Sequence, residues 1–265
     1  MNLFVQGVGL VGPGLDDWSS ARPVLAAEEP HHVRPTVKPV PALLPATERR
    51  RSSDAARLAI QAATEAFTMA GMPGQALSTI FVSSDGDGDI THRICEALAK
   101  PDRAVSPTSF HNSVYNAPAG YWSIATGSHC GSTTLCAFDT SCAAGLLEAA
   151  VFATVERLPV LLVVYDLTKP EPLHATRPVS HSFAAAFLFS PSLVGSTLMR
   201  WHVSLTPRRP PTAFPSGIDS SLEDNPAARC LPLLCALATQ TSQRITLDYF
   251  DEHSLEVVCE QVAHA

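Results

Sequence analysis

Residues 133–165 read TTLCAFDTSCAAGLLEAAVFATVERLPVLLVVY, and this stretch decides the fold class. Residues 133–138 have the composition of a strand, residues 140–157 are predicted to be helical, and residues 159–165 form a strand of nearly pure valine and leucine. The helix is apolar almost all round, so we expect both of its faces to be buried. The uninterrupted apolar run is typical of a parallel strand covered on both sides. Together they predict a buried β–α–β unit at the centre of a layered α/β sheet.

The rest of the chain adds further strands and helices around this unit. Residues 106–121 are predicted to be a loop rich in Pro, Ser and Asn that leads into a helix ending at Gly127, and residues 208–225 a second loop. The pattern predicts strands at 3–8, 79–83, 182–189 and 198–205, helices at 16–26, 53–70, 89–99 and 226–239, and a final hairpin of 244–250 with 255–260.

Composition bounds the function. An apolar content of 46% across 265 residues supports a real core and excludes a disordered chain. A net charge of −7 argues against nucleic-acid binding, which depends on neutralising phosphates. Only 16% of the residues are charged, so we expect part of the surface to be covered by a partner. We expect no export signal or membrane span, and the odd number of seven cysteines favours reduced thiols in the cytoplasm.

Two short motifs imitate ligand sites. Gly7-Val-Gly-Leu-Val-Gly12 matches a dinucleotide fingerprint, but Pro13 and Gly14 extend the turn where a helix should start. Asp85-Gly-Asp-Gly-Asp89 imitates a calcium loop that lacks its central glycine, so we interpret these acids as caps of the helix that follows. The histidines and cysteines show no zinc spacing, and we expect neither a metal nor a cofactor.

Cys142 is the strongest local signal of chemistry. It lies where a predicted strand turns into a predicted helix, among small residues. A helix N-terminus stabilises a thiolate, so the position suits a nucleophile that accepts an acyl group. The alternative is a small cysteine that is packed in the core because nothing larger fits.

Several stretches carry a family resemblance. They are Gly7-Val-Gly9, the basic segment LPATERRR at 44–51, SPTSFHNSVYNAPAGYWSIATG at 106–127 and FDTSCAAGL at 138–146. Over residues 3–190 the chain resembles the N-terminal half of a β-ketoacyl synthase, with residues 191–265 as a divergent closing segment of the same single domain. The resemblance implies a thiolase-like half-fold: a mixed sheet with helices on both faces, a buried central helix, and a short C-terminal helix and hairpin. It also places Cys142 at the nucleophile position and implies dimerisation along the strand before it.

The chain departs from the condensing enzymes of that family in its histidines. Such enzymes need two further histidines, one in a His-Gly-Thr context and one before a glycine-rich turn, to drive decarboxylation and stabilise the enolate. After Cys142 the histidines stand in neither context; they are His174, His181, His202, His253 and His264. The chain therefore resembles a non-catalytic chain-length factor of aryl-polyene, polyketide or fatty-acid-type gene sets. Such a subunit pairs with a full-length ketosynthase as a heterodimer and closes its acyl tunnel.

If this pairing holds, residues 133–138 extend the sheet across the interface and an aromatic-rich loop lines the tunnel. The interface or tunnel residues are Phe110, Tyr115, Tyr121, Trp122, Thr133, Leu135 and Phe138, and for the four aromatics from 110 to 122 an ordinary core role is the alternative. Acyl carrier protein is acidic, so a subunit of charge −7 is expected to meet it only through the partner. Two rival functions remain. One is an acyltransferase or hydrolase with Cys142 as nucleophile and His111, His129 or a partner's histidine as base; the other is a module that binds carrier protein or pathway enzymes.

Overall fold

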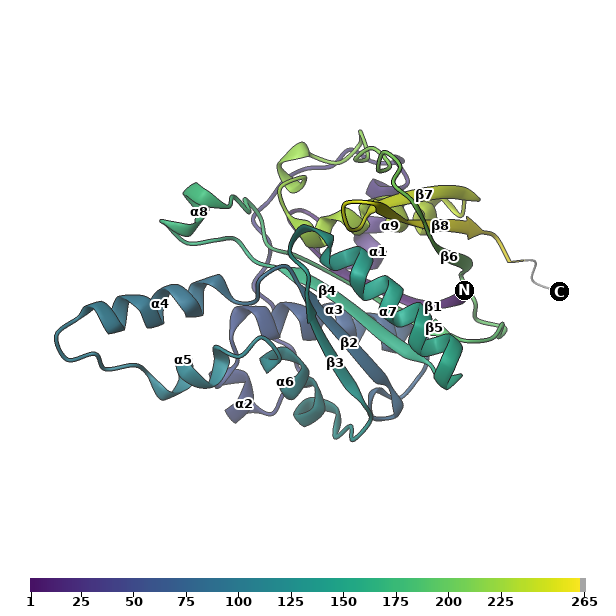
Figure 1. The fold of residues 1–265 in the computed structure, drawn as a ribbon. Helices are drawn as coiled ribbons and strands as arrows, with labels where there is room; N and C mark the ends of the chain where they lie inside the picture. Colours follow the sequence, from purple (N-terminus) through teal and green to yellow (C-terminus); the bar gives the residue numbers. More distant parts are fainter. Residues whose placement is uncertain (263–265) are drawn as a thin grey trace.

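One mixed sheet of eight strands runs through the computed structural model, which describes residues 1–262 (Figure 1). Residues 263–265, including His264 of the sequence analysis, lie outside this range. The sheet order is β3-β2-β4-β5-β1-β6-β8-β7, where β2 pairs in parallel with β3 and β4 and every other pairing is antiparallel. The strands are β1 (Asn2–Val11), β2 (Ser78–Ser83), β3 (Ser132–Cys136), β4 (Val160–Asp166), β5 (Phe183–Ser190), β6 (Met199–Pro207), β7 (Gln243–Asp248) and β8 (His253–Glu260).

Helices cover both faces of the sheet, and each face has its own apolar core. One face packs against α3 (Asp54–Met69) and α6 (Ala117–Thr126). The other packs against α1 (Trp18–Leu25), α7 (Ser141–Glu156), the 3-10 helix η4 (Pro226–Cys230) and α9 (Leu231–Thr239). The remaining elements are α2 (Ala46–Arg51), α4 (Gly88–Ala99), α5 (Pro107–Asn112), α8 (Leu173–Thr176), η1 (Gly74–Ala76), η2 (Phe138–Thr140) and η3 (Ser220–Leu222).

Glycines of β1 let α3 lie directly on the sheet. A Cβ atom on Gly7 would stand 2.0 Å from the carbonyl oxygen of Ala66, and one on Gly9 would stand 2.2 Å from that of Ala62. Both glycines lie inside the strand, which runs on to Val11 rather than ending at residue 8. The glycine pattern that imitates a dinucleotide site therefore serves the contact between helix and strand.

Helix α7 reaches equally close to the other face. A Cβ atom on Gly145 would lie 2.5 Å from Cγ2 of Val82. The predicted burial of both helix faces is wrong, because Val151 and Val155 on the outer side are 41% and 68% exposed. By length and composition the segment Phe138–Glu156 could cross a membrane, yet its face of small residues packs on the sheet as in a core helix.

The predicted β–α–β unit is present with one difference. Strand β4 is buried along its whole length, as expected from its composition. However, it pairs in parallel only with β2 and antiparallel with β5, and β2 lies between it and β3. Strand β3 is consequently an edge strand that is only half-buried, and it ends at Cys136, two residues earlier than predicted.

Two further predictions about elements were tested by the structure. Ser53 begins α3 as expected, accepting the backbone N–H of Ala56 at 3.3 Å. The predicted loop at residues 106–121 is wrong, because it contains α5 and the start of α6. Ser106 caps α5 and Pro107 occupies its first position, where a missing N–H costs nothing. The proline that suggested a loop is thus a helix-start signal.

Helices α4 and α5 project from the body of the molecule (Figure 1), and we call residues 88–112 the arm. Asp87 caps α4 by accepting the backbone N–H of Ile90 at 3.1 Å, which confirms the capping interpretation of the acidic cluster. Ile90 is also the single α4 residue that is buried. The arm therefore leaves apolar side chains such as Leu98 and Phe110 in solvent.

The close contact of α3 with β1 predicts a steep cost for any side chain at residue 9. We expect Gly9→Ala to lower the free energy of unfolding by about 3 kcal/mol, because the added methyl group meets a backbone carbonyl that cannot rotate away. Urea unfolding followed by circular dichroism measures this. The matched control is Gly120→Ala in α6, where a Cβ atom has open space, and we expect no loss there. Equal effects of the two substitutions contradict the packing argument.

Candidate functional site

The turn between β3 and α7 carries the cysteine that the sequence singled out. Ser141 holds this turn together: its Oγ accepts the backbone N–H of Ala137 at 2.9 Å and donates to the carbonyl of Phe138 at 2.7 Å. Phe138 itself has a φ of 51°, a left-handed conformation that costs energy for a bulky side chain. The turn is therefore a constrained elbow, and Cys142 follows it in the first turn of the helix.

The thiol of Cys142 faces the interior and not an opening. Cys142 is 4% exposed and belongs to the core between the sheet and α7. It neighbours the fully buried Cys230 of η4 in the same core. Burial raises the pKa of the Cys230 thiol well above its usual value, and the neighbouring Cys142 raises it further. The elbow thus has the backbone of a nucleophile site, but the segment from the C-terminal part of the chain seals it.

An ion cluster covers the elbow on its solvent side. Arg177, from the loop between β4 and β5, donates to Asp139 at 2.9 Å and pairs with Asp85 at 3.4 Å. Its guanidinium also lies over the ring of Phe138, 3.5 Å from the centroid. Arg229, beside Cys230, pairs with Asp139 at 3.4 Å. These contacts stabilise the strained turn and cover it with ion pairs.

A buried carboxyl group lies at the end of β4. Both hydroxyls and one backbone N–H of Ser83 and Ser84 donate to Oδ1 of Asp166, at 2.8–2.9 Å. Its Oδ2 is buried without a partner among the described residues. Burial raises the pKa of Asp166 from 3.8 to about 6 in spite of these donors.

The predicted interface residues fall into two groups. Tyr121 and Trp122 are core residues, 2% and 1% exposed, and Trp122 packs edge-on against Phe67 with ring centroids 5.6 Å apart. Phe110, Tyr115 and Phe138 are at the surface, with 70%, 56% and 58% of each exposed. Thr133 and Leu135 are half-buried on the edge strand β3. The core position of Tyr121 and Trp122 follows from α6 packing on the sheet beside α3.

The histidines named as rival bases lie on other parts of the chain. His111 packs against Tyr121, with ring centroids 6.0 Å apart. His129 is exposed and precedes the amino end of β3, whereas Cys142 follows its carboxyl end. Within residues 1–262, no group of three or more His, Cys, Asp or Glu side chains is arranged to hold a metal ion.

The sequence analysis did not identify Asp166 or the residues that close the elbow. Asp166 could have been identified, since it is the polar residue that ends an otherwise apolar strand. No sequence pattern marks Arg177, Arg229 and Cys230, because they come from loops and a short helix far along the chain. Their role depends on tertiary contacts alone.

Comparison with known proteins identifies the family of this chain. A family model described as "Beta-ketoacyl synthase, N-terminal domain" matches residues 18–248. This chain belongs to that family. The match confirms the resemblance read from the sequence, while no curated protein matches the chain.

Solved structures show that this synthase-family chain has the expected thiolase-like fold. It is similar to a chain of the ketosynthase ApeO in complex with its chain length factor ApeC from Xenorhabdus doucetiae, at a TM-score of 0.74 and 20% identity over 97% of this chain and 99% of the other. It is also similar to the ishigamide ketosynthase/chain length factor, at a TM-score of 0.73 and 12% identity over 99% of this chain and 100% of the other. A third similar structure is a beta-ketoacyl synthase from Burkholderia phymatum STM815, at a TM-score of 0.67 and 10% identity over 99% of this chain and 100% of the other. Across these proteins the half-fold is kept although the sequences have diverged.

The sealed elbow predicts that Cys142 is unreactive in the folded chain. We expect iodoacetamide to label the exposed Cys95 and Cys130 within minutes, and Cys142 and Cys230 only after unfolding, because their thiols have no access to the reagent. Peptide mass spectrometry with and without urea measures this. Labelling of Cys142 in the folded chain as fast as Cys95 contradicts the sealed geometry.

The buried Asp166 predicts a pH-dependent stability. Because its pKa is raised on folding, its contribution is fully present below pH 3.8 and is lost as the pH rises through about 6. We expect the stability of Asp166→Asn relative to the natural protein to rise by about 2 kcal/mol from pH 4 to pH 7. Urea unfolding at several pH values measures the difference. Glu65, whose pKa is also raised to about 6, is present in both proteins and cancels. A difference that does not change with pH refutes the prediction.

Proposed function

We propose that this chain is a non-catalytic, ketosynthase-like subunit that pairs with a full-length ketosynthase and closes the far end of its acyl tunnel. The observation that carries the proposal is the contrast at the elbow: the thiol is sealed, and the strand beside it is open. A sealed thiol accepts no acyl chain, and the histidines after Cys142 stand in neither sequence context that drives decarboxylation. An open strand next to it offers a place for a partner.

The two edges of the sheet differ in a way that supports pairing at β3. At the other edge, β7 is covered by Thr212, whose N–H donates to the carbonyl of Thr246 at 2.9 Å and whose hydroxyl accepts the N–H of Thr246 at 2.9 Å. For β3, no loop within residues 1–262 bonds to its outer edge. Its sequence STTLC also lacks the lysine or proline that usually protects an exposed edge. Strand β3 is therefore free to pair with a strand of another subunit.

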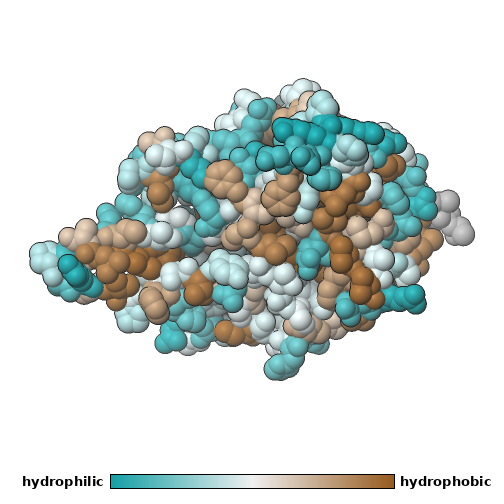
Figure 2. Space-filling view, viewed as in Figure 1, coloured by the Kyte–Doolittle hydropathy of each residue, from teal (hydrophilic) through white to brown (hydrophobic). Residues whose placement is uncertain are grey.

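Apolar side chains flank this edge and extend it into a surface. We call it the partner face and define it as β3, Phe138, the outer side of α7 and the exposed aromatics Phe110 and Tyr115. Figure 2 shows hydrophobic colour over α7 and over the arm. Large exposed apolar areas with few charges are typical of lasting interfaces. The exposed Phe110 and Tyr115 are available to contact a partner, as tunnel closure requires.

The solved relatives agree with this arrangement at the level of fold. ApeC is a chain length factor in complex with the ketosynthase ApeO, and the ishigamide structure is also a ketosynthase/chain length factor. A third similar structure contains an acyl-carrier protein with its ketosynthase, in a type II polyketide system. We extend the same roles to this chain: a heterodimer in polyketide, aryl-polyene or fatty-acid-type elongation, cytoplasmic, with carrier protein docking on the partner.

Reconstitution with a full-length ketosynthase from the same pathway tests the proposal. We expect the two chains to co-purify as a heterodimer, and Leu135→Lys to weaken the pair at least tenfold because it places a charge in the β3 interface. The control is Thr241→Lys, an exposed turn residue remote from β3. A stable monomer that captures no ketosynthase refutes the pairing.

Product analysis of the reconstituted pair tests tunnel closure. We expect Phe110→Ala and Tyr115→Ala to change the chain length of the product with assembly intact, while Phe250→Ala, an equally exposed aromatic in the C-terminal hairpin, leaves it unchanged. Cys142→Ala is expected to leave both rate and product unchanged. A collapse of turnover in Cys142→Ala supports the acyl-transferring rival, and unaltered products in the aromatic variants support mere recruitment.

A further inference from the structure

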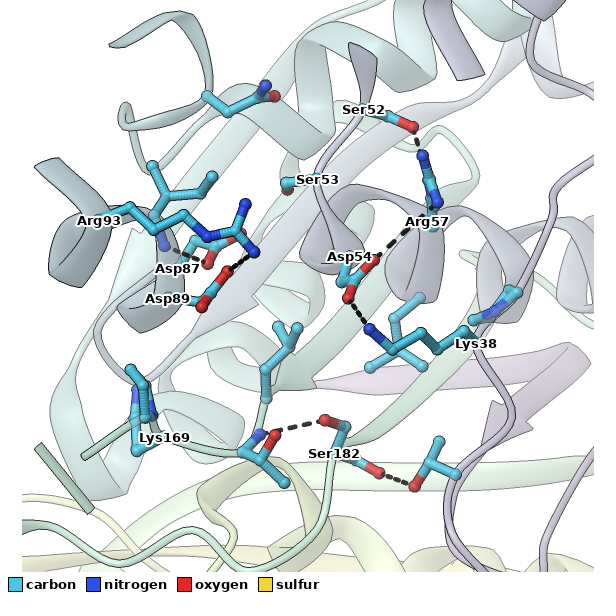
Figure 3. A pocket seen from close by; sticks show the side chains of 18 of the residues that line it. Lys38, Ser52, Ser53, Asp54, Arg57, Asp87, Asp89, Arg93, Lys169 and Ser182 are labelled. Carbon is cyan, nitrogen blue, oxygen red and sulfur yellow. Dashed lines mark hydrogen bonds and ion pairs between the residues drawn. The ribbon is translucent and has the colours of Figure 1, made fainter. Parts of the chain in front are cut away.

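A cleft of about 710 Å³ lies on the side of the molecule where β4 ends and β5 begins (Figure 3). The N-terminal ends of α3 and α4 meet there, and the third wall is α5. The extended segment 35–39 and the loops at 167–170 and 180–182 complete it, joined by a bond from the Thr36 hydroxyl to the carbonyl of Ser182 at 2.7 Å. The volume is in the range of sites that hold small organic ligands.

Positive charge predominates in this cleft, although the chain as a whole is acidic. Each carboxylate already has a partner: Asp54 with Lys38 at 2.7 Å, Asp89 with Arg93 at 2.5 Å, and Asp87 with the N–H that it caps. The carboxylates therefore leave cationic groups in excess and require no cation from solution. The lining cations are Lys38, Arg50, Arg51, Arg57, Arg93 and Lys169, of which Lys169 pairs with Asp85 outside the lining; the lining carboxylates are Asp54, Asp87 and Asp89.

Two of these cations are unpaired within the described part of the chain. Arg50 and Arg51 are exposed at the rim and form no ion pair there. The backbone of Arg51 is fixed across the cleft, because its carbonyl accepts Nδ2 of the buried Asn112 at 2.8 Å. Guanidinium groups bind carboxylate or phosphate oxygens through two parallel hydrogen bonds. An unpaired arginine that lines a cleft offers these donors to an oxyanion.

Aliphatic residues also line the cleft, among polar side chains such as Ser52, Thr108 and Ser182. Val37, Leu58, Ile90 and Leu167 contribute aliphatic side chains to its walls. We propose that the cleft binds an amphipathic oxyanion, an aliphatic body with a phosphate or carboxylate head, with the head on Arg50 and Arg51 and the body against these aliphatic walls. A lining that combines unpaired guanidinium groups with aliphatic side chains distinguishes this ligand from a free inorganic anion or an uncharged lipid.

This site is separate from the partner face. None of β3, Phe138 or the exposed residues of α7 lines the cleft. Helix α5 contributes Thr108, Ser109 and Asn112 to the cleft, whereas Phe110 on the same helix is outside its lining and exposed. Binding in the cleft is therefore measurable on the isolated chain, whatever its partner.

Calorimetric titration of the purified chain tests the proposal with four probes below their critical micelle concentrations. We expect octyl phosphate and octanoate to bind, inorganic phosphate and octanol to bind at least tenfold more weakly, and the octyl phosphate affinity to fall with added salt. The comparison of the two anionic probes shows which head group the cleft prefers. Octanol binding as tightly as octyl phosphate overturns the assignment.

Variants locate the binding. We expect the double change Arg50→Ala and Arg51→Ala to weaken octyl phosphate at least tenfold, and Val37→Asp to weaken it similarly by placing a carboxylate in the apolar wall. The matched control is Arg103→Ala, an arginine at the end of the arm that does not line the cleft. Unchanged affinity in both cleft variants, or an equal loss in the control, overturns the proposal.

Discussion

The close packing of two helices on opposite faces of one sheet, made mainly by small residues, is the constraint on which this structure depends. Helix α3 buries mainly alanines and α7 mainly small residues; glycines of β1 meet backbone carbonyls of α3, and Gly145 of α7 meets the side chain of Val82. Dispersion contacts are strongest at such short range, but they tolerate no added volume. The position of α7, and with it the elbow before its first turn, is therefore set by the sheet.

The elbow combines a strained residue, Phe138, with the start of a helix. Cys230, Arg177 and Arg229 close it from two sides, so Cys142 is buried while Phe138 is exposed. Next to it, the unprotected edge of β3 provides a natural position for a second subunit.

Much of the fold could be predicted because its decisive residues are local. Residues adjacent in sequence are enough to predict the apolar strand β4, the Ser53 cap of α3 and the final hairpin. The errors arose where tertiary position decides: composition could not show that β2 lies between β3 and β4, or that the outer side of α7 is uncovered. For the site, Cys142 was found but its closure was not, since Cys230 and Arg177 come from distant segments. Tyr121 and Trp122 look like interface aromatics in sequence and lie in the core because α6 turns them inward.

The cover that Thr212 provides over β7 has a consequence for assembly size. A sheet with two free ends can add neighbours without limit, as fibrils do. Here one end is already occupied by the chain's own loop, so growth through strand pairing stops after a single addition. A sheet with one covered edge and one free edge therefore favours a closed pair of subunits and not a filament.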